Sequence, residues 1–193
     1  MRTFPPAYGD HFPLRVTLRG ITPGVWRLLH VPAQTSLGEL HEVLQVAFGW
    51  QNSHLHDFTV GKIRFGMIDV EDEIFAVDEH AAPLGAVARA GTQMLYRYDF
   101  GDDWDHDILV ENVKPSSGDS ITCSAGARAC PPEDCGGPPG YENVLRVLND
   151  PNDDEYASMK EWVDRKFDPE RFDSAAVNKH LAALAKRLSR RRR

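Results

Sequence analysis

The chain has 193 residues and a formal net charge of −7, which is long enough for one domain with a real core. Hydrophobic residues make up 41% and charged residues 26% of it, as in an ordinary globular protein. No apolar run approaches the roughly 20 residues of a membrane helix, and residues 1–6 show no signal-peptide core. Three cysteines are too few for a disulfide framework, so we expect a cytoplasmic protein without a membrane partner.

Positive charge is concentrated at the C-terminus. Six basic residues lie there: Lys186, Arg187, Arg190, Arg191, Arg192 and Arg193. We predict that residues 1–185 form a single domain and that residues 186–193 form an exposed, disordered tail, because like charges in a short segment repel one another. The acidic body differs from the basic surface of a typical nucleic-acid-binding domain, so a weak contact with phosphates is expected only from the tail.

The first half of the chain is predicted to contain strands and one helix. Alternating apolar and polar residues predict strands over Leu14–Leu18 and Val25–Val31, joined as a hairpin. The second has apolar residues on both faces, which favours a central position in the sheet. Further elements are predicted as strands over Leu55–Val60 and Lys62–Phe65, a loop over Met67–His80 with at most a short strand at Ile74–Val77, and helical turns within Pro83–Ala90.

A helix is predicted from Ser36 to Phe48. Ser36 and Glu39 have the spacing of a capping box, and Gly49 is a typical terminator. Apolar residues follow at helical spacing, so we expect this face to cover the sheet formed by the preceding hairpin.

The aspartate-rich segment Tyr96–Glu111 is predicted to be a β-hairpin with Gly101-Asp102-Asp103 as its loop. A register with Phe100 opposite Trp104 follows from that loop. It also places Tyr98 opposite His106, Tyr96 opposite Ile108, Arg97 opposite Asp107 and Asp99 opposite Asp105. Because two opposed aspartates repel each other, the pair requires a cation, a shared proton or a slipped register, unless backbone N–H groups or Arg128 satisfy both acids.

The second half is predicted to be a loop followed by helices. Cys123–Tyr141 has too many prolines and glycines for regular structure, and we expect it to fold back beside the aspartate-rich end of the hairpin. Helices are predicted over Tyr141–Leu148, after a capping pair at Asn152 and Glu155, and after an N-cap at Asp173. Strands first and helices last predict an α+β fold, with a mixed, largely antiparallel sheet, one packed helix and a C-terminal helical segment.

The hairpin is the first candidate site. Its candidate ligand-binding residues are Tyr98, Asp99, Asp102, Asp103, Trp104, Asp105 and His106. Clustered carboxylates bind Mg²⁺ or Mn²⁺, and Asp99, Asp105 and His106 are the predicted metal ligands. The alternative is structural, with Asp102 and Asp103 as turn residues, Asp107 paired with Arg97, and His106 packed against Tyr98.

Three further patterns could bind a ligand. Cys130 and Cys135 have a spacing found in zinc sites, which His106 or Cys123 could complete, but only one tight ligand pair is present and small buried thiols are common. Glu133 and Asp134 could join the acids of the hairpin, or Asp134 could cap a turn. His54 and His56 share one face of a strand, as a metal pair or as two partly exposed histidines.

Three motifs resemble the plasmid pRiA4b ORF-3-like family. They are L-R-V-T-L-R-G-I-T-P-G-V-W-R, Y-R-Y-D-F-G-D-D-W-D-H and C-P-P-E-D-C-G-G-P-P-G-Y. The similarity covers roughly residues 14–184 and leaves out the arginine-rich tail. The resemblance implies a fold and a setting in plasmids, insertion elements and transposons, and it implies no reaction. Some members have a resolvase-type name, but the sequence contains none of the short nucleophile, P-loop or dinucleotide motifs.

We therefore predict a non-enzymatic accessory protein associated with mobile elements, whose acidic aromatic groove recruits a protein partner or a small cationic ligand. The alternative is a metal-dependent enzyme acting on nucleic acid. No cofactor is established by the sequence, and a divalent metal (Mg²⁺, Mn²⁺ or Zn²⁺) is the one that its residues could hold.

Overall fold

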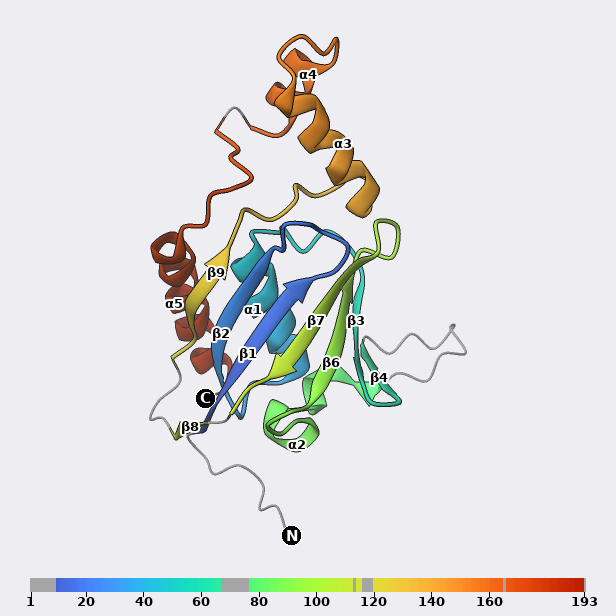
Figure 1. Cartoon of the computed structure of the whole chain (residues 1–193). Coiled ribbons are helices and arrows are strands. Elements are labelled where there is room, and N and C mark those ends of the chain that lie inside the picture. Colours follow the sequence, from blue (N-terminus) through green and yellow to red (C-terminus); the bar gives the residue numbers. More distant parts are fainter. Residues whose placement is uncertain (1–9, 67–76, 113, 116–119, 165, 193) are drawn as a thin grey trace.

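The computed structural model describes residues 10–66, 77–112, 114–115, 120–164 and 166–192. Its centre is a sheet with strand order β5-β4-β3-β6-β7-β1-β2-β9, while β8 pairs with β1 (Figure 1). The strands are β1 Asp10–Leu18, β2 Trp26–Pro32, β3 His56–Val60, β4 Ile63–Gly66, β5 Val77–Asp78, β6 Gln93–Tyr98, β7 Trp104–Val110, β8 Lys114–Pro115 and β9 Thr122–Ala127. Neighbouring strands are antiparallel except β4 and β5, which are parallel, so the predicted mixed, largely antiparallel sheet is confirmed.

The helices are α1 Leu37–Phe48, α2 Leu84–Val87, α3 Gly137–Asn149, α4 Tyr156–Trp162 and α5 Ser174–Arg191, with a short 3-10 turn η1 at Glu79–Ala81. Helix α1 covers one face of the sheet, and α5 lies beside it along β9 (Figure 1). Helices α3 and α4 extend beyond the end of the sheet. The α+β class is therefore confirmed. No helix in the described ranges is long and apolar enough to cross a membrane.

Alternation along the strands separates a buried face from an open one. Leu14, Val16 and Leu18 are at most 2% exposed and face α1 as part of the core. The opposite face carries ion pairs between neighbouring strands, such as Arg15–Glu111 and Arg19–Asp107. One buried and one polar face is the usual arrangement of an antiparallel sheet. The predicted central position of the second strand is confirmed, because β2 lies between β1 and β9.

Helix α1 begins and ends as its sequence predicts. The Ser36 side chain accepts a hydrogen bond from the Glu39 N–H, and the Glu39 carboxylate accepts one from the Ser36 N–H. Gly49 ends the helix in the left-handed conformation, with φ of 84°. Polar contacts also attach the buried face to the sheet, because Arg27 Nε donates to the Ala47 carbonyl and Gln45 donates to the Tyr96 hydroxyl.

The predicted register of the hairpin is wrong by two residues. Tyr98, not Phe100, lies opposite Trp104, and Arg97 lies opposite Asp105 with 2.9 Å between Nε and Oδ1. The opposed aspartates of the predicted register do not occur. Asp99 leaves the strand with φ of 58°, and its side chain accepts hydrogen bonds from the two following turn N–H groups. This aspartate turn ends β6 two residues early.

Two predictions for the second half also need correction. Residues 122–127 form strand β9 and α3 begins at Gly137, so only the middle of Cys123–Tyr141 is irregular. Cross-strand bonds to β2 outweigh the weak local preference of this segment. Glu155 precedes α4 without a side-chain cap, so the predicted capping pair does not form.

The C-terminal segment differs from the predicted tail. Asp173 caps α5 as expected, but the helix continues through Arg191 and buries Leu188 to 1% exposure. Arg187, Arg191 and Arg192 form ion pairs with Glu42 or Glu39 of α1. Residues 186–192 are therefore ordered against α1, because acidic partners offset the repulsion that predicted disorder. Most of the predicted loop Met67–His80 and the strand expected at Ile74–Val77 lie outside the described residues.

Candidate cation-binding site

The turn after β6 supplies the first acid of the site. Asp99 is 8% exposed, and its backbone N–H donates to the Leu55 carbonyl at 2.9 Å. Its Oδ1 accepts from the N–H groups of Gly101 and Asp102. Because one carboxylate oxygen is used by the turn, Oδ2 is the oxygen that faces outward to other groups.

The loop between α1 and β3 supplies a histidine. Asn52 fixes this loop with φ of 58°: its N–H donates to the Gln45 side chain at 2.7 Å, and its side-chain oxygen contacts His41 Nε2 at 2.6 Å. His54 follows two residues later. The loop that presents His54 is thus attached to buried side chains of α1.

The segment before α3 supplies the second acid. Asp134 has φ of 59°, a conformation that aspartate tolerates better than most residues. The Gly136 N–H donates to Asp102 Oδ2 at 3.0 Å, so the segment lies beside the end of the hairpin, as predicted. Gly137 must be glycine, because its φ is +68° and a Cβ would lie 2.4 Å from the Asp102 carbonyl oxygen. Glycine at this position therefore permits a close approach to the hairpin backbone.

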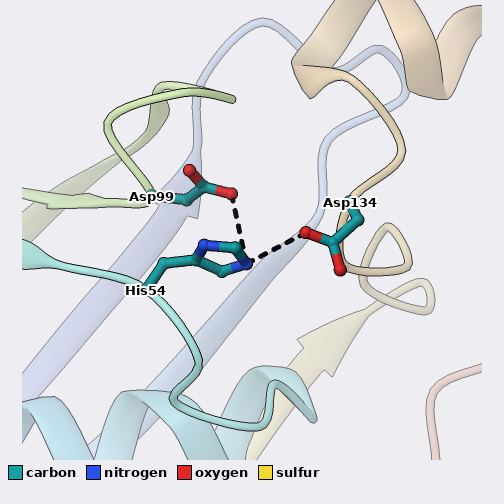
Figure 2. A group of neighbouring side chains, drawn as sticks. All are labelled: His54, Asp99 and Asp134. Carbon is teal, nitrogen blue, oxygen red and sulfur yellow. Dashed lines mark ion pairs between the residues drawn. The ribbon is translucent and has the colours of Figure 1, made fainter.

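The three side chains converge on one point (Figure 2). His54 Nε2 lies 3.5 Å from Asp99 Oδ2 and 3.0 Å from Asp134 Oδ1. One donor atom from each of the three residues falls within 4.8 Å of the others. His54 Nε2 is shielded from solvent, yet neither carboxylate meets it in hydrogen-bond geometry within the described chain. A ring nitrogen that faces two oxygens without a hydrogen bond suits a shared cation.

Tyr98 joins the three segments that carry these residues. Its hydroxyl donates to Glu133 Oε1 at 2.5 Å and accepts from the Ser53 N–H at 3.0 Å. Burial, with the bond to Glu133 adding to it, raises the pKa of Tyr98, so the phenol keeps its proton. Each residue of the site directly follows one member of this group in the sequence: Asp99 after Tyr98, His54 after Ser53, and Asp134 after Glu133.

The predicted metal ligands are only partly brought together. Asp99 and Asp134 meet, but Asp105 lies on the open face with Arg97 and Arg19. His106 points to the opposite face, as alternation requires, and it is fully buried beside Phe48 and Trp50. Its Nδ1 contacts the Trp104 carbonyl at 2.9 Å, and burial lowers its pKa to about 4. The predicted trio Asp99, Asp105 and His106 is therefore wrong.

The other candidate residues make contacts within the fold. Trp104 is 1% exposed in the core. Asp102 binds the Gly136 N–H, and Asp103 lies 3.7 Å from Arg97. Glu133 accepts from Tyr98 and from the Gln51 N–H. Asp102 and Glu133 thus hold the turn and the loops around the site, whereas the exposed Asp103 side chain faces Arg97 at the surface.

The zinc hypothesis gains no support from the cysteines. Among the residues that the structure describes, no cysteine belongs to a group of three possible metal ligands. Cys123 lies on β9 and contacts the Ala125 carbonyl. Burial raises the pKa of Cys135 to about 12 and also that of Cys130, so both stay as thiols at neutral pH.

His54 and His56 do not form the metal pair considered above. His56 stacks on His41 with 3.4 Å between ring centroids and binds Glu79, which is 2% exposed. Sequence reasoning placed His54 with His56 and missed its approach to Asp99 and Asp134. The only local signal was a histidine within a polar loop, which is too common to indicate a ligand.

The fold and the site define an α+β protein with an open, largely antiparallel sheet and a histidine–carboxylate cluster at one end of it. A model of the family described as plasmid pRiA4b ORF-3-like protein matches residues 10–176. The chain belongs to this family, and the resemblance inferred from its motifs is confirmed.

Two relatives carry no assigned activity. The uncharacterized protein y4hQ of Sinorhizobium fredii (strain NBRC 101917 / NGR234) is 40% identical over 168 residues, which are 86% of this chain and 84% of that protein. The crystal structure of a protein of unknown function, MM3350 from Methanosarcina mazei Go1, is similar with a TM-score of 0.81 and 32% identity. That match covers 88% of this chain and 98% of the other.

Proposed function

We propose that this protein is an accessory protein of mobile elements that binds a divalent cation at His54, Asp99 and Asp134. The convergence of three donor atoms from three separate segments carries the proposal. The mobile-element setting is supported by the family description, which names a plasmid. Three unpaired cysteines support a cytoplasmic location.

The donor set fits a transition-metal ion or zinc. Ligands that share one ion at about 2.1 Å lie roughly 3.0–3.5 Å from one another in octahedral or tetrahedral geometry. The two distances from His54 Nε2, 3.0 and 3.5 Å, match those edges. Mg²⁺ prefers a shell of oxygen ligands alone, whereas imidazole nitrogen suits Zn²⁺ and carboxylates suit Mn²⁺. We therefore propose Zn²⁺ or Mn²⁺.

The proposed role of the cation is to hold a binding surface in shape. His54, Asp99 and Asp134 come from the α1–β3 loop, the β6–β7 turn and the segment before α3. A cation shared by these three residues would link their segments beside the β6–β7 turn. The protein would then present a fixed surface to a partner when the cation is bound.

One observation favours a second function, a metal-dependent enzyme. Three protein ligands leave at least one coordination position for water or substrate, as in catalytic zinc sites. The Asp134 side chain is 71% exposed, so that position would be open to solvent. In this alternative the exposed Lys186 and Arg190 of α5 could contact a nucleic acid substrate.

Calorimetric titration of chelator-treated protein with Zn²⁺ and with Mn²⁺ tests the proposal. We expect one site per chain, and we expect Asp99→Asn and Asp134→Asn each to weaken binding about tenfold or more, as the loss of a charged ligand does. Asp103→Asn is the matched control. It removes the same charge from a residue that also has positive φ, but Asp103 is not in the cluster.

The outcomes separate the alternatives. Equal binding by all three variants would exclude the cluster as the cation site, and no uptake by the unmodified chain would end the proposal. If the metal-loaded protein cleaves a single-stranded or duplex oligonucleotide and Asp99→Asn abolishes the cleavage, the enzymatic alternative replaces the accessory role.

A further inference from the structure

Trp162 is the starting point, because it is a large aromatic side chain exposed on a short helix. It ends α4 and is 50% exposed. Trp26 is half-buried and has a cation over its ring, with the Arg15 guanidinium 4.6 Å from the centroid. Within the described residues, no cation or second ring lies over Trp162. Half of this large aromatic surface is therefore accessible to a ligand.

Trp162 stands between two hollows of about 330 and 360 Å³. Asp134 lines both hollows, as Trp162 does. The first is completed by Cys135, Val144 and Met159, and the second by Trp50, Pro131 and Phe167. We call the two hollows and the tryptophan between them the Trp162 groove.

The groove is acidic as well as aromatic. Among the described residues, no lysine or arginine lines either hollow, whereas Asp134 lines both and Glu133 lines the second. The sequence around the groove, residues 130–167, has nine acidic and four basic side chains. The Glu133 oxygens already accept from Tyr98 and Gln51, so the more exposed Asp134 is the carboxylate that a ligand would reach.

We propose that the Trp162 groove binds an arginine side chain of an extended segment from a partner protein. A guanidinium can stack flat on an indole ring and at the same time form two hydrogen bonds to a carboxylate. The ammonium group of lysine has neither the planar shape that stacks on an indole ring nor the paired N–H groups that bind both oxygens of a carboxylate. Asp134 and Trp162 line the same hollows, so one arginine can use both.

The basic end of a second copy is a poorer occupant. Arg187, Arg191 and Arg192 are already paired with Glu39 and Glu42 of their own chain. A second copy would have to break these pairs or present Arg190 from within helix α5, whereas an extended partner segment arrives with its arginine free. Arginine binding does not require the cation proposed above, although the two would compete for Asp134 if both bind.

The test is fluorescence anisotropy of a labelled tetra-arginine peptide mixed with the full chain in the presence of a chelator. The chelator removes the proposed cation, so that it does not compete for Asp134. Tetra-lysine and tetra-citrulline peptides are compared with it. We expect arginine to bind most tightly, and we expect Trp162→Leu to weaken arginine binding about fivefold or more, as the loss of a cation–π contact does. Trp162→Phe should retain most of the binding. Trp26→Leu is the matched control and should leave it unchanged.

Each possible result either supports or overturns the proposed arginine site. Because Trp162→Leu preserves every charge, equal binding by this variant and by the unmodified chain would show a non-specific attraction to an acidic protein and overturn the proposal. Equal binding of the arginine and citrulline peptides would also overturn it. Equal weakening by Trp162→Leu and Trp26→Leu would place the contact elsewhere. Circular dichroism confirms that the variants are folded before binding is compared.

Discussion

At the scale of single residues, Tyr98 has the largest influence on the candidate site without belonging to it. Its ring is fully buried and stacks on Trp50 with 5.0 Å between centroids. Its hydroxyl bonds to the two loops that carry His54 and Asp134. Residues that orient ligands from behind commonly change metal affinity as much as some ligands do.

We predict that Tyr98→Phe weakens cation binding about tenfold and lowers the free energy of unfolding by about 1–2 kcal/mol. The hydroxyl is lost while the ring is kept, so the two loops lose their common bond. Calorimetric titration and urea denaturation measure the two effects. Tyr96→Phe is the control, because this equally buried tyrosine bonds through its hydroxyl to His41 and Gln45 of α1 and makes no direct bond to the loops that carry His54 and Asp134. If both variants bind the cation equally well, Tyr98 has no positioning role.

At the scale of elements, helix α5 acts as a brace for α1. Leu181, Leu184 and Leu188 are buried on one of its faces, and its arginines reach Glu39 and Glu42 on the helix that covers the sheet. Exposed ion pairs contribute little individually, about 0–1 kcal/mol. Burial of Leu188 is therefore the larger part of what the end of α5 contributes.

Truncation after Ala185 tests this brace. We predict a loss of about 2–4 kcal/mol in the free energy of unfolding, from the buried leucine and the ion pairs together. Leu188→Ala alone should reproduce most of the loss in urea denaturation, whereas Arg190→Gln, at an exposed position, should cause little. An unchanged denaturation midpoint after truncation would show that residues 186–193 are dispensable for stability.

At the scale of the whole molecule, two buried histidines link stability to pH. Burial lowers the pKa of both His41 and His106 to about 4 from 6.5. The unfolded chain therefore binds more protons than the folded one between these values. The stability that neutral histidines contribute is complete above about pH 6.5 and is lost as the pH falls toward 4.

We predict that the free energy of unfolding decreases between pH 7 and pH 4 and that His106→Leu makes this decrease shallower by about 1–3 kcal/mol. The variant starts from a lower stability at pH 7, because two backbone carbonyls near His106 lose their donor. Urea denaturation at several pH values provides the slopes. Parallel curves for the variant and the unmodified chain would show that His106 does not contribute to the pH dependence.

Local sequence determined the first strands, helix α1 and the family of this protein. Period-2 alternation located the first strands, and the capping box and Gly49 located α1, because these signals depend on backbone geometry within a few residues. The specific motifs around the hairpin and the Pro-Gly segment identified the family. The approach of residues 123–141 to the aspartate-rich β6–β7 turn was also predictable, because the segment is long enough to reach it.

The tertiary structure alone decided the register and the site. A slip of two residues leaves every side chain on the same face of a strand, so alternation could not exclude it, and the turn at Asp99 settled the pairing. His54, Asp99 and Asp134 are far apart in the sequence and meet because the Tyr98 hydroxyl and the bonds Asp99–Leu55 and Gly136–Asp102 join their segments. The packing of the end of α5 likewise depends on distant segments, through the burial of Leu188 and the ion pairs with Glu39 and Glu42 of α1. Contacts between distant segments leave no local period to detect, and the free energy that forms them belongs to the folded chain as a whole.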